Sequence, residues 1–179
     1  DLAPALASHG GRLFLAWKGS GNDNLNLAFS NDNGATFAGA TTFAETSDDS
    51  PALVSHNGRL FLGWRGSGNE NLNVARVELI GNTAGGFAIG GLDQKVTLAE
   101  TSDFSPALGS SEGVLYLAWR GSGNEDLNII ASLDGAAFFE KRISFESSSD
   151  SPALATLDRR LYYGWKGSNN ENINVGGVT

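Results

Sequence analysis

Short apolar runs alternate with polar, glycine-rich turns along the whole chain. The first long run, which ends at Trp17, is rich in aromatic and branched residues and contains neither Gly nor Pro, which predicts a strand. Successive side chains of a strand point to opposite faces. Here Leu13, Leu15 and Trp17 share one face, and Phe14 and Ala16 share the other. Because both faces are apolar, we expect this strand to be buried on both sides.

The run and the turn after it recur four times, as the phrase Trp-(Lys/Arg)-Gly-Ser that begins at Trp17, Trp64, Trp119 and Trp165. Each copy contains about four short strands and no helical periodicity, which is typical of a propeller blade. The sequence therefore predicts an all-β fold, a single domain over 1–179 that forms a β-propeller of four blades with about four antiparallel strands each. The expected blades are 1–46, 47–101, 102–147 and 148–179.

The fourth copy ends after its third strand, so the last blade is expected to have three strands and an open edge. An unpaired edge strand can pair with another chain. The sequence thus raises two possibilities, a homo-oligomer formed through this edge or a larger ring completed by further blades.

Charge and composition limit the kinds of partner that the chain is expected to bind. The chain has 12 Lys and Arg against 20 Asp and Glu, a net charge of −8, which argues against binding to nucleic acid. No apolar run is long enough to span a membrane. No signal-peptide pattern precedes Asp1, and the lack of Cys leaves the redox compartment undetermined. Because the chain contains no Met, we expect it to be processed, trimmed or cut from something longer, with a secreted or cell-surface origin.

A second motif follows the third strand of the first copy. Ser30, Asp32, Gly34 and Phe37 resemble the Asp-box of sialidase-type propeller blades, and a contracted version recurs at Ser132, Asp134, Gly135 and Phe138. The resemblance implies a structural turn in which the Asp accepts backbone N–H bonds, the Gly adopts a positive φ and the aromatic ring plugs between strands. It implies blade architecture throughout the chain, with a lectin-type, non-catalytic member as the expectation.

The repeated polar turn is the candidate binding site. Each copy offers a base, an acid and two Asn residues, and such a combination suits sugar hydroxyls, which donate and accept hydrogen bonds at once. One site per blade or blade interface would give a multivalent lectin. The candidate ligand-binding residues are Lys18, Asn22, Asp23, Asn26, Arg65, Asn69, Glu70, Asn73, Arg120, Asn124, Glu125, Asn128, Lys166, Asn170, Glu171 and Asn174.

A structural interpretation stays open beside the lectin. The Asn and acid side chains could form self-bonded turns and the charges could pair between blades, which would leave a structural or protein-interaction propeller. The four Trp residues are expected in the core. His9 and His56 occupy equivalent turns, so we interpret both as surface residues.

Catalysis is not expected from this pattern. A catalytic centre needs residues with different tasks, whereas the conspicuous charges here obey the repeat, and the arginine motif that opens sialidases is missing. We therefore predict a protein that is not an enzyme, with a sialidase-like hydrolase as the less favoured alternative. No cofactor is predicted. Calcium is conceivable because acids and Asn oxygens are hard ligands, but the sequence has no Asp-x-Asp-x-Asp-Gly loop.

Overall fold

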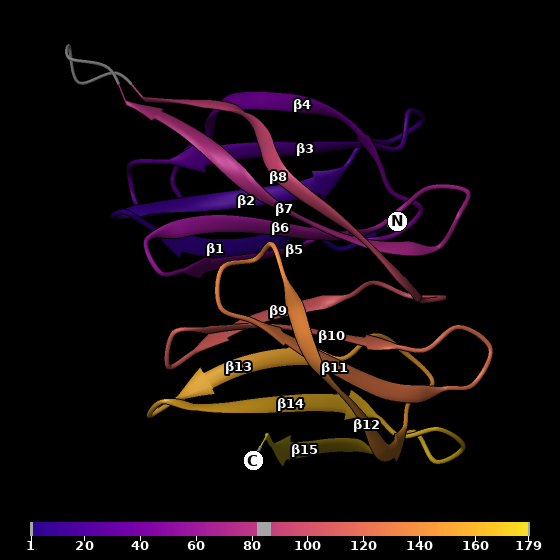
Figure 1. Ribbon diagram of the computed structural model, residues 1–179. Coiled ribbons are helices and arrows are strands. Elements are labelled where there is room, and N and C mark those ends of the chain that lie inside the picture. The colour runs from indigo at the N-terminus through magenta and orange to yellow at the C-terminus, as the bar shows by residue number, and fades with distance from the viewer. Residues whose placement is uncertain (1, 82–86, 179) are drawn as a thin grey trace.

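The protein is a four-bladed β-propeller in a computed structural model that describes residues 2–81 and 87–178, with the side chains of 139–145 left aside (Figure 1). Each blade is an antiparallel sheet whose strands run outward from the centre in chain order. The last blade has three strands, as predicted. The strands are β1 (Ala5–His9), β2 (Arg12–Lys18), β3 (Asn24–Ser30), β4 (Ala38–Thr46), β5 (Ala52–His56), β6 (Arg59–Arg65), β7 (Asn71–Gly81), β8 (Phe87–Thr101), β9 (Ala107–Ser111), β10 (Val114–Arg120), β11 (Asp126–Ser132), β12 (Phe138–Ser147), β13 (Ala153–Leu157), β14 (Arg160–Lys166) and β15 (Ile173–Gly177).

Because neighbouring strands are antiparallel, the turns and linkers that connect them lie on two opposite faces of the propeller. The turn after the second strand of a blade and the linker to the next blade both leave the sheet at the same end. We call this end the polar-turn face, and its first-blade members are the turn 19–23 and the linker 47–51. The repeated Trp-(Lys/Arg)-Gly-Ser phrases therefore all lie on one side of the molecule.

The innermost strands β1, β5, β9 and β13 surround a central channel of about 310 Å³. Its wall is built from three consecutive residues of each inner strand, for example Leu53, Val54 and Ser55 of β5. In Figure 1 these strands meet between the upper pair of blades and the lower pair.

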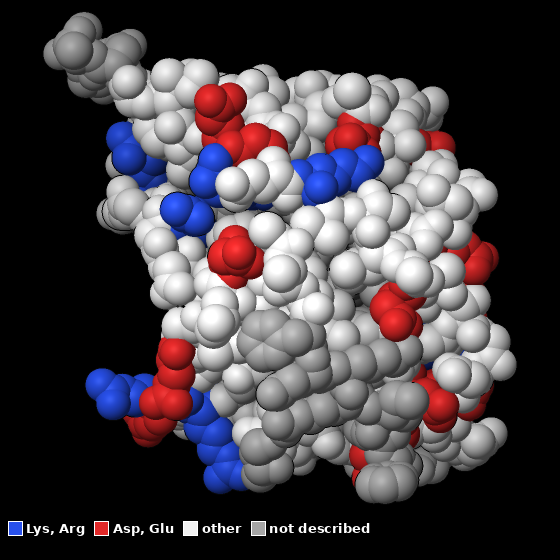
Figure 2. Space-filling view, in the orientation of Figure 1, with Lys and Arg blue, Asp and Glu red and all other residues white. Residues whose placement is uncertain are grey.

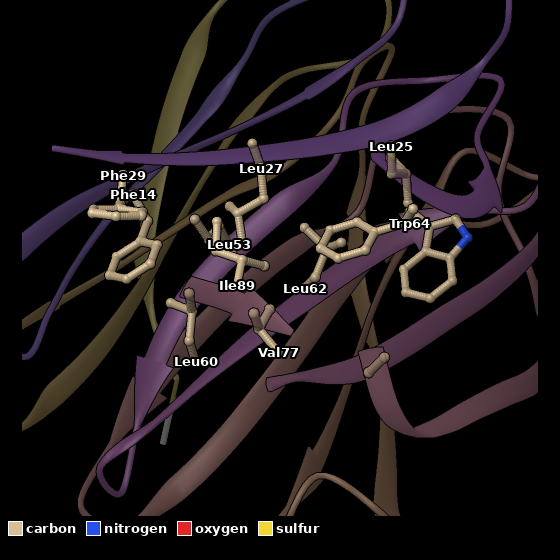
Figure 3. Packing of buried hydrophobic residues seen from close by; sticks show 13 residues of the cluster. Phe14, Leu25, Leu27, Phe29, Leu53, Leu60, Leu62, Trp64, Val77 and Ile89 are labelled. Carbon is tan, nitrogen blue, oxygen red and sulfur yellow. The ribbon is translucent and has the colours of Figure 1, made fainter. Parts of the chain in front are cut away.

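The core lies between blades, and it explains why both faces of the second strand are apolar. Phe14, Leu25 and Leu27 of the first blade pack against Leu62 and Trp64 of the second (Figure 3). The second blade repeats the arrangement against the third, where Trp119 takes the place of Trp64. Each blade thus presents its Phe-x-Ala side to the following blade and its Leu-x-Leu-x-Trp side to the preceding one. The expectation that the Trp residues belong to the core is confirmed for Trp64, Trp119 and Trp165, which are 1%, 1% and 8% exposed.

The long spacing between the second and third copies comes from one extended hairpin. β7 has 11 residues and β8 has 15, and their pairing continues outward as far as Gly81 and Phe87. The extra length carries an ion pair between Arg76 and Asp93. The insertion therefore lengthens a strand pair at the rim and leaves the inner strands in their usual positions.

Two residues at the same repeat position should respond differently to truncation. Leu72 is fully buried between blades, whereas Ile173, its equivalent in the last blade, is 78% exposed. At low protein concentration, Leu72→Ala should reduce the free energy of unfolding by about 2–5 kcal/mol, the usual cost of a core cavity. Ile173→Ala should change it by less than about 0.5 kcal/mol. Urea denaturation of both variants checks this, and equal losses would contradict the assignment of the core.

Candidate functional site: the polar-turn face

The four polar turns share one backbone conformation. The acid of each turn, Asp23, Glu70, Glu125 or Glu171, has a positive φ of 56° to 60°. Residues other than Gly rarely adopt this left-handed backbone region, and Gly and Asn adopt it more easily than Glu. In each turn the carboxylate of this acid pairs with the base of the same turn.

The glycine after each base allows the turn to close. A Cβ added at this glycine would collide with the side-chain oxygen of the Asn three residues later, and this holds in all four copies. The residue pairs are Gly19 with Asn22, Gly66 with Asn69, Gly121 with Asn124, and Gly167 with Asn170. Close packing of an amide against the backbone thus explains why Gly follows the base in each phrase.

The two Asn residues of each candidate set lie in different environments. The first one is exposed and its Oδ1 accepts the backbone N–H two residues later, at 3.1 Å from Asn69 to Asn71 and at 3.0 Å from Asn170 to Asn172. The second one points into the blade: Asn73 donates to the Asn71 carbonyl and accepts from Thr97. In the described part of the chain, the Nδ2 groups of Asn22, Asn69, Asn124 and Asn170 have no acceptor.

The bases of the two middle blades connect three segments each. Arg120 is 9% exposed. Its Nε donates to the carbonyl of Ser148 at 2.8 Å, and its two terminal nitrogens reach Asp103 at 2.9 Å and Glu125 at 3.3 Å. Arg65 makes the equivalent contacts. Each arginine therefore ties its own turn to the linker that enters its blade and to the linker that leaves it.

The two acids of these blades extend the connections to the next blade. Glu70 accepts a hydrogen bond from Ser122, and Glu125 accepts one from Ser168 at 2.9 Å. Lys18 of the first blade and Lys166 of the last pair only with their own acids, Asp23 at 2.5 Å and Glu171 at 3.1 Å, among the described side chains. Arginine thus occurs in the blades with two neighbours, and lysine in the first and last blades.

The linker acids complete this arrangement. Asp103 accepts from the backbone N–H of Gly123 and from Ser122, and these hydrogen bonds, with the one from Arg120, lower the pKa of Asp103. Asp48 is held in the same way: the backbone N–H of Gly68 and then the hydroxyl of Ser67 lower its pKa. Both carboxylates are thereby fixed in the charged form at the polar-turn face.

The turn that carries the Asp-box resemblance lies on the opposite face. Asp32 accepts from the Ser30 hydroxyl at 2.6 Å and from the Thr36 backbone N–H and hydroxyl, which lower its pKa to about 2. Gly34 has a φ of +87°. Asp134 accepts backbone N–H bonds from Ala136 and Ala137. The expected plugging role is wrong for Phe37, whose side chain lies at the surface with 39% exposure.

The histidine interpretation also needs correction. His56 is 2% exposed, and its ring nitrogens lie 2.9 Å from the Ser110 hydroxyl and 3.2 Å from the Leu133 carbonyl. His9 makes the equivalent contact to Ser55 at 2.8 Å. The turn composition indicated exposure, but the His56 ring is buried against the inner strand of the following blade, whereas His9 stays partly exposed. Both histidines connect neighbouring blades.

One position on the linkers differs from copy to copy. Two residues before each Pro-Ala-Leu phrase stand Leu2, Asp49, Phe104 and Asp150. Asp49 accepts from the backbone N–H of Ser50 and from Ser105 of the next linker at 2.6 Å. The Phe104 ring lies 4.9 Å from the Arg120 guanidinium carbon. Because these side chains differ between copies, the polar-turn face is not fully symmetric, and a pattern of repeated residues does not reveal this.

Charge does not divide the surface into regions of one sign. Figure 2 shows basic side chains next to acidic ones on the visible face. Lys95 pairs with Glu45 across two blades at 2.6 Å. In the described ranges 2–81 and 87–178, no group of three or more His, Asp or Glu side chains is placed to hold a metal ion, and no helix is long and apolar enough to cross a membrane.

Comparison with known proteins identifies the fold. No protein-family model matches the sequence, and no curated protein matches it closely enough to count as a relative. Among solved structures, the GH43_1 enzyme from Xanthomonas citri complexed with xylotriose is similar over 99% of this chain and 68% of its own, with 14% identity and a TM-score of 0.65. Trypanosoma rangeli sialidase in complex with sialic acid matches over 98% and 35%, with 13% identity and a TM-score of 0.59. The GH43 β-1,3-galactosidase BT0265 matches over 93% and 39%, with 11% identity and a TM-score of 0.58.

These comparisons correct the prediction that the chain is not an enzyme. The similar structures are carbohydrate-active propeller enzymes, so the fold neighbours point to an enzymatic group of propellers. The resemblance to sialidase-type propellers is supported at the level of the fold.

Arg120 and Lys166 provide a test of the connections between blades. Arg120→Lys removes the Nε donor to Ser148 and one of the two carboxylate contacts, so the free energy of unfolding should fall by about 1–3 kcal/mol. Lys166→Arg, the reverse exchange in the last blade, should change it by less than about 0.5 kcal/mol. Urea unfolding measures both. Similar effects at the two positions would show that Arg120 does not connect the linkers.

Asp103 predicts how stability depends on pH. Because its pKa is lower in the folded chain than in the unfolded one, its contribution is complete above the unfolded value and is lost as the pH falls through the folded value. The melting temperature of the native protein should therefore fall below about pH 4. Asp103→Asn should have a lower melting temperature at neutral pH and a shallower fall in acid. Parallel curves for the two proteins would contradict this role.

Proposed function

We propose that the protein binds carbohydrate on its polar-turn face, with near-equivalent contacts contributed by successive blades. The observation that carries the proposal is the row of exposed Asn side chains. Each Oδ1 is fixed by the turn, so each Nδ2 is held in place as a donor directed to solvent. Fixed donors beside acids that can accept hydrogen bonds suit sugar hydroxyls. The bases and inner Asn residues of the candidate set position this row, through their contacts within and between blades.

The similar structures support this class of ligand. Their names include a complex with xylotriose, a complex with sialic acid and a galactosidase. Weak single sites repeated around the face would gain affinity for a branched or polymeric glycan by avidity. This arrangement favours extended glycans over free monosaccharides.

A second candidate function is glycoside hydrolysis on the same face, favoured by acids that stand at this linker position in two of the four copies. Asp49 and Asp150 occupy equivalent positions in the second and last blades, and Phe104 takes this position in the blade between them. Glycoside hydrolysis commonly uses a pair of carboxylates on either side of the scissile bond. Oδ1 of each acid accepts the following Ser backbone N–H at 2.7 Å. Oδ2 of each has no hydrogen-bond partner in the described part of the chain.

Binding is tested by replacing the exposed Asn residues with their acids. The combined variant with Asn22→Asp, Asn69→Asp, Asn124→Asp and Asn170→Asp keeps the Oδ acceptors that the turns need and removes the four donors. On an array of xylose-, galactose- and sialic-acid-containing glycans, the native protein should bind a defined set, and the variant should lose at least about tenfold in affinity, as expected for several lost hydrogen bonds.

The matched control is Asn31→Asp, an exposed Asn on the opposite face. It should bind glycans as the native protein does. If the native protein folds and binds no glycan on the array, or if the fourfold variant binds as well as the control, carbohydrate recognition by this row of Asn residues is wrong.

Hydrolysis is tested separately with oligosaccharides from the bound set and with aryl glycosides. We expect native turnover that falls by about 100-fold or more in Asp49→Asn and in Asp150→Asn, because general acid and base groups contribute on that order. Glycan binding should persist in both variants. Turnover that is unchanged in the variants, or absent in the native protein, would remove this second candidate and leave the binding proposal in place.

A further inference from the structure

The last blade exposes residues that the other blades bury. Ile173 and Val175 of β15 are 78% and 70% exposed. At the first of these repeat positions the earlier blades have Leu25, Leu72 and Leu127, and at the second they have Leu27 and Val74, all of which are at most 4% exposed. These positions belong to the side of a blade that packs against the following blade. We call this surface of the last blade the trailing face.

The first blade exposes the complementary surface. Leu6 of β1 is 57% exposed, whereas its equivalents Leu53 and Leu108 are 8% and 7% exposed. Trp17 is only partly buried, although Trp64 at the same position is 1% exposed. These residues belong to the side that packs against a preceding blade, and we call this surface the leading face.

The two faces do not cover each other within the chain. β1 packs on β5, β5 on β9 and β9 on β13, but β13 and β1 share no comparable contact. The blades therefore form an open ring, with the leading face on one side of the opening and the trailing face on the other.

We propose that the trailing face of one copy of this chain binds the leading face of a second copy. The two faces are the halves of an interface that the chain already builds between its own successive blades. A second copy presents both halves, with the branched and aromatic side chains in the matching register.

The polar contacts of the internal interfaces can also be completed in this way. Between blades, Ser122 donates to Glu70 and Ser168 donates to Glu125. The equivalent pair across the proposed contact is Ser20 of one copy and Glu171 of the other. Both residues are exposed in the single chain, and the Glu171 side chain is 85% exposed.

Exposed apolar side chains that lie together mark surfaces that bind a partner, and Leu6 on the leading face and Ile173 and Val175 on the trailing face are exposed in this way. Because the two faces differ, the contact is head to tail, and its assembly can continue or close into a ring. Each copy carries a net charge of −8, so repulsion opposes association and added salt should strengthen it.

The proposal is tested by sedimentation of the native chain over a range of concentrations and salt. We expect the mass to rise from that of one chain to at least twice that value, and to rise at lower protein concentration when salt is added. Quenching of Trp fluorescence by acrylamide should decrease in parallel, because Trp17 becomes covered. A native chain that stays monomeric throughout, with Trp quenching that does not change with protein concentration, overturns the proposal.

Two variants make the test specific. Val175→Asp alters only the trailing face and Leu6→Asp only the leading face, and both sites are exposed enough to accept the charge without unfolding. Each variant alone should stay monomeric. An equal mixture should form dimers and nothing larger, because each variant keeps the face that the other has lost.

The matched control is Leu133→Asp, at a residue that is 61% exposed in the turn between β11 and β12. It should assemble like the native chain. Assembly that persists in Val175→Asp, or a mixture of the two face variants that remains monomeric, would show that the two faces do not bind each other. Circular dichroism of each variant confirms that a loss of assembly is not a loss of fold.

Discussion

The structure depends on one constraint, that a blade with two apolar faces must be covered on both sides. Leu62 and Trp64 face the preceding blade while Phe61 and Val74 face the following one, and all four are at most 1% exposed. A single blade would leave one or both of these surfaces in water, which costs about 25 cal/mol per Å² of apolar area. The blades are therefore stable only as a series, and each element outside the sheets is shaped by how neighbouring sheets meet.

The polar turns follow from the same constraint. Where two blades meet, the linker between them carries backbone carbonyls into a partly buried place, and a buried carbonyl needs a donor. Arg65 and Arg120 supply it to Ser102 and Ser148, and their remaining nitrogens engage the acids around them. The acids Glu70 and Glu125 pair with these arginines although their own backbone has a positive φ, which is unfavourable for Glu. Much of the charge that resembles a binding signature thus stabilises blade contacts, and the exposed Asn side chains bond only within their own turns.

Sequence patterns were sufficient to predict the strands, the four sheets and the burial of the repeated Trp residues, because strand periodicity and the repeat are local. They could not reveal which blade side meets which neighbour, and so could not show that His56 is covered by β9 or that Phe37 stays at the surface. Such burial depends on contacts between residues far apart in the chain. The sequence predicted the candidate site only as residue types in a turn. The structure shows that Asn69 is directed to solvent and Asn73 inward, a difference that the residue types do not reveal. The expectation that the chain is not an enzyme rested on the symmetry of the repeated charges, and most of those charges pair within or between blades.

The exchange of Arg for Lys has a consequence for how such a protein can change in length. Arg65 and Arg120 mark the blades that are joined on both sides, while Lys18 and Lys166 mark the two end blades. Arginine thus marks a blade that is joined on both sides, so a copy of such a blade inserted beside it would carry both halves of a contact that the structure already forms. The curvature of the ring would limit how many blades could be added in this way.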